Sequence, residues 1–261
     1  MDLGDLLQCL DAELQGAIQS FWDTRRAQRE RQARSERPDQ GARSEVTGGA
    51  QMKALESVVA RRLERLNVPD LMIQRSVAGA RARTELPGFY RPEKAWDMVV
   101  LSRDRLVAAV EFKSQVGPSF GNNANNRAEE AVGSGEDIRK AIRERRFGAV
   151  SPLPFIGYVF LLEDCPEVHS PVSLREPFFR ADPVFAALEP SVAGEGCRAA
   201  SYAERYEILC RRLRLEGLYT ATCLILATKE SPTKVTTPAE DLSFRMFMAT
   251  LLGHAAAFAV L

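Results

Sequence analysis

Histidine and cysteine are scarce in this chain of 261 residues, which contains two histidines and five cysteines. Neither His169 nor His254 has a second histidine, a cysteine or an acidic cluster at the spacing of metal ligands. The cysteines are odd in number and widely spaced, and none forms a C-x-x-C pair. These scarcities argue against histidine-based catalysis, a zinc cluster and a framework of disulfide bonds.

Long apolar runs and an excess of one charge are also missing. No segment approaches the roughly 18 to 20 continuous apolar residues of a membrane helix, and the N-terminal segment lacks the basic and apolar regions of a secretory signal. A cytosolic protein is therefore expected. Basic and acidic residues both number 35, so net charge neither favours nor opposes a polyanionic partner. Of the basic residues 29 are arginines, which suit phosphates and guanine edges, although a GC-rich genome would produce the same excess.

The apolar pattern divides the chain into three predicted parts. Residues 1–23 have apolar side chains at helical spacing, which is typical of an N-terminal amphipathic helix. Residues 24–50 form an arginine-rich arm or linker, which is either a mobile connection or a basic arm that gains order against a nucleic-acid backbone. Residues 51–261 contain enough apolar residues for one folded domain with a sizeable core.

Helical and extended patterns alternate within residues 51–261. A helix is predicted from about residue 51 to residue 66, with Glu56 at the margin of its apolar face. Apolar strands are predicted at residues 71–77, 96–102, 105–114, 154–162 and 219–229. Further helices are predicted at residues 127–147, 201–215 and 239–261, the first of them interrupted by glycines. This order predicts an α/β fold with a central mixed β-sheet flanked by helices on both faces.

The most informative stretch is WDMVVLSRDRLVAAVEFK, residues 96–113, in which two apolar segments flank a polar turn at residues 102–105. This pattern is typical of a β-hairpin. If the turn is centred on Asp104, residues whose numbers add up to 208 lie opposite one another. Asp97 is then opposite Glu111, at a distance where two carboxylates either repel each other or share a divalent cation.

Side chains alternate along a strand, so Glu111 and Lys113 are predicted to point to one face of the sheet and Phe112 to the other. Asp97 would join them, and two carboxylates with a lysine are the parts of a metal-dependent phosphodiesterase site. The acids can hold Mg²⁺, the ion can lower the pKa of a bound water, and the lysine can position that water or help deprotonate it. Glu56 could add a third oxygen ligand. A surface ion pair between Glu111 and Lys113 would give the same pattern, but the apolar runs around it indicate a buried strand pair, where unpaired carboxylates are costly.

An asparagine-rich segment at residues 119–127 follows the hairpin closely and is predicted to emerge as a loop near this site. Its polar candidates for DNA contact are Asn122, Asn123, Asn125, Asn126 and Arg127. Asparagine pairs with adenine and arginine with guanine in the major groove, but asparagine is also common in turns and helix caps. Both interpretations are open from the residues alone.

Residues 96–137, WDMVVLSRDRLVAAVEFKSQVGPSFGNNANNRAEEAVGSGED, closely resemble the core of the XhoI-type restriction endonucleases, members of the PD-(D/E)XK nuclease superfamily. The resemblance is specific because it includes the asparagine-rich segment and the EEAVGS segment as well as the generic acidic and lysine residues. It is firm over about residues 56–147 and looser after them. The Pro-Asp of the superfamily is Trp96-Asp97 in this chain, which keeps the carboxylate and loses the proline.

This resemblance implies a single nuclease domain over residues 51–261, with a PD-(D/E)XK restriction-endonuclease-like core and integrated DNA-recognition loops. Asp97 and Glu111 would be the metal ligands. Lys113 would be the water-positioning base, and Glu56 the helix carboxylate that is common in the superfamily.

The resemblance also implies an activity, that of a Mg²⁺-dependent type II restriction endonuclease cleaving double-stranded DNA at the palindrome CTCGAG. The setting would be the bacterial cytoplasm, with a cognate DNA methyltransferase as genetic partner. A palindrome implies a homodimer in which each subunit reads one half-site. One alternative is a repair or recombination nuclease of the same superfamily that recognises DNA structure. The other is a non-catalytic DNA-binding protein on that fold, against which the intact Asp97, Glu111 and Lys113 argue.

Overall fold

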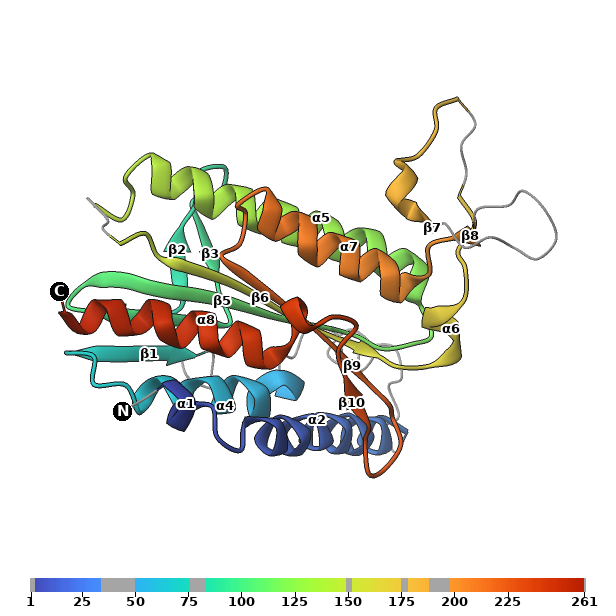
Figure 1. Ribbon diagram of the computed structural model, residues 1–261, viewed down its shortest axis with the longest axis horizontal. Coiled ribbons are helices and arrows are strands. Elements are labelled where there is room, and N and C mark those ends of the chain that lie inside the picture. Colours follow the sequence, from blue (N-terminus) through green and yellow to red (C-terminus); the bar gives the residue numbers. More distant parts are fainter. Residues whose placement is uncertain are drawn as a thin grey trace.

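The computed structural model describes residues 3–33, 50–75, 83–148, 152–174, 178–187 and 198–260, and its centre is a six-stranded mixed sheet (Figure 1). The strand order is β1-β4-β5-β6-β9-β10. The strands are β1 (Leu71–Arg75), β4 (Met98–Ser102), β5 (Arg105–Gln115), β6 (Phe155–Glu163), β9 (Ala221–Ala227) and β10 (Val235–Thr236). β5, β6 and β9 are parallel, whereas β1, β4 and β10 are antiparallel to their neighbours. Every residue of β6 and β9 is buried, as expected for apolar strands at the centre of an α/β sheet.

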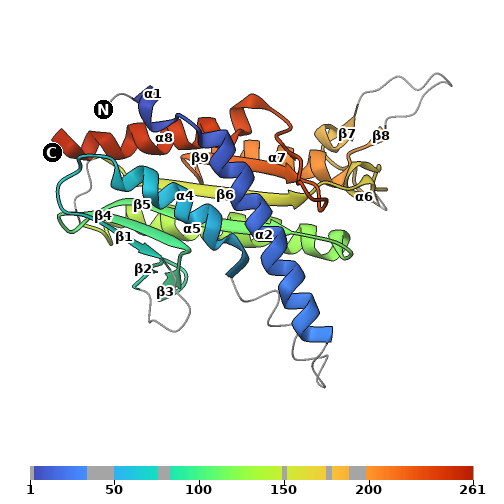
Figure 2. The same ribbon diagram turned by 90° about the horizontal axis from the view of Figure 1, so that it is seen from below.

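Helices cover both faces of this sheet (Figures 1 and 2). On one face lie α5 (Phe120–Arg143) and α7 (Tyr202–Leu215), and on the other lie α1 (Leu3–Leu6), α2 (Leu10–Ala33), α4 (Lys53–Glu64) and α8 (Phe244–Ala257). Each face has its own apolar cluster, so the sheet separates two cores. This arrangement confirms the predicted α/β class with a restriction-endonuclease-like core. Within the described residues no helix combines the length and apolarity that crossing a membrane would require.

Several short elements were not predicted from the sequence. The one that matters for the site is a two-stranded antiparallel ribbon of β2 (Glu85–Pro87) and β3 (Glu93–Ala95), which precedes β4. The predicted helices at about residues 51–66 and at 239–261 begin or end in short 3₁₀ helices, namely η1 (Ala50–Met52), η3 (Glu240–Leu242) and η4 (Phe258–Val260). The other unpredicted elements are α6 (Pro166–His169), η2 (Pro183–Phe185), β7 (Ala186–Ala187), β8 (Arg198–Ala199) and β10. They are too short for a periodic pattern to identify them.

The N-terminal helix is longer than predicted. α2 continues to Ala33, so residues 24–33 of the predicted arm are helical (Figure 2). Arginine, glutamine, glutamate and alanine favour helices even without an apolar face, and an ion pair of 2.9 Å joins Arg26 to Asp23 within this part of the helix. Residues 34–49 of the arm lie outside the described residues. The division of the chain at residues 23 and 50 stays a prediction.

The predicted hairpin is formed by β4 and β5, and beside the site it has the predicted register. Met98 pairs with Val110 and Val100 pairs with Ala108, so the numbers in each pair add up to 208. This register brings Asp97, the residue before β4, beside the middle of β5. The Asp97 carboxylate accepts a hydrogen bond of 2.8 Å from the backbone N–H of Phe112.

The turn of the hairpin differs from the prediction, because it consists of two residues, Arg103 and Asp104, both with positive φ (47° and 61°). A turn of this length would by itself shift the register by one residue and turn Glu111 to the other face. A β-bulge restores it, since the pairing shifts between the turn and the site, and the successive residues Val107 and Ala108 both lie in the same core cluster.

The predicted asparagine-rich loop at residues 119–127 is wrong, because α5 begins at Phe120 and passes unbroken through Gly133 and Gly135. Each asparagine costs only a fraction of a kcal/mol in a helix, and the buried ring of Phe120 anchors the first turn against the core. Glycine is needed for close packing at position 135, where a Cβ atom would lie 2.8 Å from a ring carbon of Tyr219. These glycines therefore do not interrupt the helix as predicted.

Candidate active site

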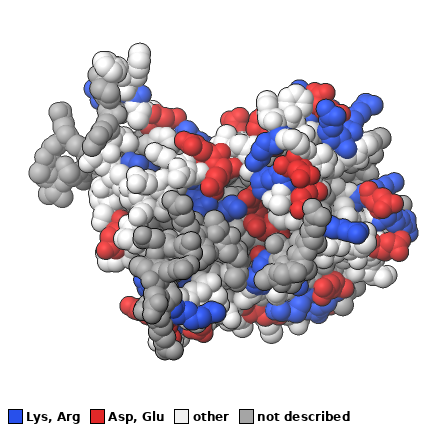
Figure 3. All heavy atoms as spheres, turned by 180° about the vertical axis from the view of Figure 1, so that it is seen from behind, with Lys and Arg blue, Asp and Glu red and all other residues white. Residues whose placement is uncertain are grey.

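A polar cleft of about 550 Å³ lies between the β2–β3 ribbon, β5 and α5. Its lining comes from all three elements and is mostly charged: Tyr90, Arg91, Lys94, Glu111, Lys113, Arg127, Glu129, Glu130, Gly133, Ser134 and Asp137. In Figure 3, acidic and basic side chains gather around a hollow near the middle of the face shown. The strongest candidates from the sequence, Glu111 and Lys113, lie in this cleft.

The structure brings Asp97, Glu111 and Lys113 together. The Lys113 ammonium lies 2.6 Å from one Glu111 oxygen and 3.9 Å from Asp97 Oδ2. Phe112 points away from them into the core on the opposite face, as the strand alternation predicts. Two carboxylates and a lysine therefore converge on one face of β5.

The electrostatics of the two carboxylates differ. Burial raises the pKa of Asp97, Lys113 lowers it and the nearby Glu111 raises it again, with a net increase. Burial acts in the same direction on Glu111, but Lys113 and Lys94 outweigh it and lower the pKa of that carboxyl. Burial disfavours the charged form of Lys113, whereas Glu111 and Asp97 favour it, so the pKa of Lys113 is raised. Asp97 is therefore the acid whose charge is least compensated.

Lys94 is a site residue that the sequence analysis missed. Its ammonium lies 2.5 Å from the second oxygen of Glu111 and 4.3 Å from the centre of the Trp96 ring. Glu111 is thus held between two lysines, one from β5 and one from β3. Only the β2–β3 ribbon brings Lys94 to this position, and because the ribbon has no periodic signal, the sequence offered no route to it.

Glu56 is more deeply buried than predicted, with 1% of its surface exposed, and not at the margin of the helix face. Its carboxylate pairs with Lys53 at 3.1 Å. Burial, opposed by Lys53 and reinforced by Asp97, raises the pKa of Glu56 to about 7. The influence of Asp97 places Glu56 near the site. In the part of the chain that the structure describes, no three histidine, cysteine or acidic side chains are arranged so that they could hold a metal ion together, so Glu56 does not complete a three-residue site with Asp97 and Glu111.

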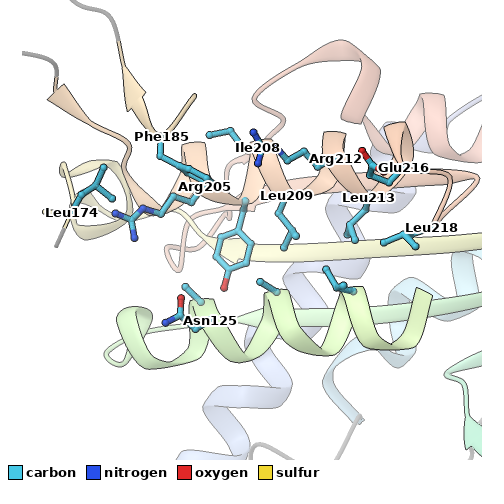
Figure 4. Close-up of a pocket in the computed structure, with 14 residues that line it drawn as sticks. Asn125, Leu174, Phe185, Arg205, Ile208, Leu209, Arg212, Leu213, Glu216 and Leu218 are labelled. Carbon is cyan, nitrogen blue, oxygen red and sulfur yellow. The ribbon is translucent and has the colours of Figure 1, made fainter. Parts of the chain in front are cut away.

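The predicted DNA-contact residues lie on the first two turns of α5 and do not share one environment. Arg127 lines the cleft and pairs with Glu130 at 2.5 Å. Asn125 lines a different cavity, an apolar groove of about 520 Å³ between α5 and α7 (Figure 4). Asn122 and Asn126 are exposed, and Asn123 is partly buried.

The donor set of the site suits a hard divalent cation. Asp97 and Glu111 offer carboxylate oxygens, which Mg²⁺ and Ca²⁺ prefer. The negative charge of Glu111 also raises the pKa of Asp97, so the two carboxylates repel each other when both are ionised. A cation between them would relieve that repulsion, and the residues present therefore fit a metal site.

A mixed sheet in this order, with paired carboxylates and a lysine on adjacent strands, defines a restriction-endonuclease-like core. A model of the family described as "Restriction endonuclease XhoI" matches residues 31–237, more than three quarters of the chain. The chain belongs to the XhoI restriction endonuclease family.

Curated relatives have the same character. The chain is 41% identical over 230 residues to the type II restriction enzyme BstVI of Geobacillus stearothermophilus, covering 85% of this chain and 95% of that one. It is 42% identical over 200 residues to the type II restriction enzyme XhoI of Xanthomonas vasicola, covering 77% and 73%. For the type II restriction enzyme AbrI of Azospirillum brasilense the identity is 40% over 184 residues, covering 68% and 80%. No solved structure matches the chain.

Proposed function

We propose that this protein is a type II restriction endonuclease that hydrolyses phosphodiester bonds of double-stranded DNA at the palindrome CTCGAG. The observation that carries the proposal is the convergence of Asp97, Glu111 and Lys113 at a cleft that Glu111 and Lys113 line together with further charged side chains of both signs. The names of the three curated relatives support the reaction class. The specific site CTCGAG comes from the family resemblance alone.

Asp97 and Glu111 would hold a Mg²⁺ ion, with Glu56 as the additional acid on the neighbouring helix. When bound, the ion supplies charge neutralisation at the phosphate and acidifies a water molecule. Lys113, whose ammonium lies 2.6 Å from Glu111 and 3.9 Å from Asp97, would orient the attacking water and stabilise the hydroxide formed from it. The pairing of Glu111 with Lys94 would hold its carboxylate in one orientation while the ion binds.

Recognition would involve Asn122, Asn123, Asn125, Asn126 and Arg127 at the start of α5. Their helix begins five residues after the end of β5, so contacts to bases and cleavage would be linked through one rigid element. A homodimer would place one such helix on each half of the palindrome. The protein would act in the bacterial cytoplasm, beside a methyltransferase that protects the same sequence.

The test is digestion of a sequenced plasmid that contains one CTCGAG site, with Mg²⁺, with EDTA, and with the Asp97→Ala variant. Linear product cut at that site, absent from both controls, is expected. Discrete cutting elsewhere would retain the enzyme class and refute the site. Cutting without sequence preference would favour a structure-directed nuclease, and absence of cutting by folded protein would refute the proposal.

A further inference from the structure

The tip of the β2–β3 ribbon, residues Gly88–Arg91, lies at the mouth of the cleft and is held there by one carboxylate. Asp137 on α5, 2% exposed, accepts hydrogen bonds from the backbone N–H groups of Phe89 (2.8 Å) and Tyr90 (2.7 Å). It also accepts one from Arg91 Nε at 2.8 Å. A Cβ atom at Gly88 would lie 2.6 Å from an Asp137 oxygen, so the backbone approaches this carboxylate as closely as glycine permits.

The tip that Asp137 fixes presents an aromatic ring to solvent. Tyr90 is 68% exposed, and its ring packs edge-on against Phe89, with ring centres 4.9 Å apart and an angle of 84°. The ammonium of Lys140 lies 5.0 Å from the centre of the Phe89 ring and braces it from α5. The Tyr90 ring is therefore pre-positioned, although little of its surface contacts protein.

Charged side chains of both signs lie beside this ring. Arg91, Lys94, Lys113 and Arg127 line the same cleft with the four acids Glu111, Glu129, Glu130 and Asp137, and these four cations are the groups suited to phosphate contacts. Side chains that enter or flank a DNA groove often place an aromatic or apolar group against bases or sugars, since every base has an apolar face. An aromatic ring at the cleft that Glu111 and Lys113 line thus combines phosphate-binding charge with an apolar contact surface.

We propose that the ribbon tip is a DNA-binding element, in which the Tyr90 ring packs against a base or sugar of the duplex next to the cleaved bond. This inference rests on the proposed function. Asp137 acts as a positioning residue, because it hydrogen-bonds three successive residues of the tip that carries Tyr90. Because Asp137 already orders the tip in the free protein, DNA binding would lose little conformational entropy in positioning the Tyr90 ring.

The test measures binding of a short fluorescent duplex carrying CTCGAG, with Ca²⁺ in place of Mg²⁺, to wild type, Tyr90→Ala, Tyr90→Phe and Phe178→Ala. Phe178 is the matched control, since it is 88% exposed and does not line the cleft. Tyr90→Ala is expected to weaken binding about tenfold, within the range for loss of one aromatic contact to a base. Tyr90→Phe and Phe178→Ala are expected to bind as wild type.

Equal binding by Tyr90→Ala and Phe178→Ala would overturn the inference while leaving the proposed function intact. Binding by Tyr90→Phe as weak as that of Tyr90→Ala would also overturn it, because the hydroxyl would then make the contact. Failure of the wild type to bind or cut DNA would instead refute the proposed function.

The role of Asp137 has its own readout. Combining Asp137→Asn with Tyr90→Ala is expected to weaken DNA binding no more than Tyr90→Ala alone, whereas additive losses would show that Asp137 does not act through Tyr90.

Discussion

Two aspartates, Asp137 of the cleft lining and Asp97 beside Lys113 and Glu111, have surroundings that are opposite in kind. Asp137 accepts hydrogen bonds from two backbone N–H groups and from the Arg91 guanidinium. Burial acts to raise the pKa of Asp137, but these hydrogen bonds outweigh it and the pKa is lowered. Asp97 accepts one backbone N–H, lies 3.9 Å from Lys113 and faces a second acid, and its pKa is raised. Hydrogen bonds within the fold compensate the negative charge of Asp137. The negative charge of Asp97 is less well compensated, and a bound cation would stabilise it.

This difference separates Asp137, an acid whose hydrogen bonds hold the ribbon tip, from Asp97, the acid that we propose as a metal ligand. The side chain of Asp137 is less exposed to solvent than that of Asp97, yet it is the one that favours its charged form. What distinguishes Asp97 is the shortage of donors and the nearness of Glu111. Functional sites commonly retain such unfavourable arrangements because a substrate or cofactor relieves them.

The largest effect is expected on the rate of DNA cleavage, when Lys113 beside Asp97 is replaced. Replacing Lys113 by Ala should reduce the rate of DNA cleavage about 10²- to 10⁴-fold, the usual contribution of a group that transfers or positions a proton. DNA binding in Ca²⁺ should persist, because the acids and the cleft remain. Single-turnover cleavage with binding measured in parallel checks this, and cleavage at the wild-type rate would remove Lys113 from the chemistry.

Glu56 is a third acid for this comparison, and burial raises its pKa as it raises that of Asp97. Its pKa of about 7 lies above the unfolded value near 4.5, so the folded state binds the extra proton between these values. The associated stability is present at low pH and is lost as pH rises through about 7. Between pH 5 and pH 8 the metal-free protein should lose up to about 3 kcal/mol of unfolding free energy from this group.

The matched variant for this prediction is Glu56→Gln, which has no charge to gain. Urea unfolding in EDTA at both pH values should give a smaller difference for the variant than for the wild type. An identical pH dependence would show that Glu56 has the same pKa in the folded and the unfolded state, and the predicted rise would be wrong.

Stability should also distinguish the two aspartates directly. Asp137→Asn should lower the free energy of unfolding by about 2 kcal/mol near neutral pH, because hydrogen bonds to a charged acceptor are lost. The loss should vanish as pH falls through the lowered pKa of Asp137. Asp97→Asn should leave stability unchanged or raise it. A larger loss of unfolding free energy for Asp97→Asn than for Asp137→Asn in denaturant titrations would contradict this difference between the two aspartates.

The smallest effects are expected on DNA affinity, for substitutions on the two sides of α5. Arg127→Ala should weaken DNA binding several-fold at all sequences and reduce the slope of log affinity against log salt by about 1. Asn125→Ala should have the least effect among the five proposed recognition residues, since Asn125 lines the groove toward α7 (Figure 4). Fluorescence anisotropy over a salt series checks both, and the reverse order would place the DNA on the α7 side.

The sequence predicted the sheet, most helices and the convergence of three site residues, because each rests on a strong local signal. Apolar runs identify β6 and β9, and strand alternation separates Glu111 and Lys113 from Phe112. The start of α5 was mistaken for a loop, since asparagine and glycine dominate it and the burial of Phe120 outweighs their low propensity.

Lys94 and Asp137 escaped prediction for a different reason. Lys94 reaches Glu111 only because the β2–β3 ribbon, too short to be periodic, folds back over β5. Asp137 lies 46 to 48 residues from its three partners and looks like an ordinary polar residue of a helix. Contacts of this range depend on tertiary packing, which single-sequence patterns do not encode.

The bulge at Val107 in β5 has a consequence for protein engineering. It lies between the hairpin turn and the acids, so it can gain or lose a residue and absorb a change in turn length. Without such a bulge, a single insertion at Arg103 or Asp104 would turn Glu111 away from Asp97. We therefore expect that the length of the hairpin tip can change, in an engineered insertion for example, while Glu111 stays opposite Asp97.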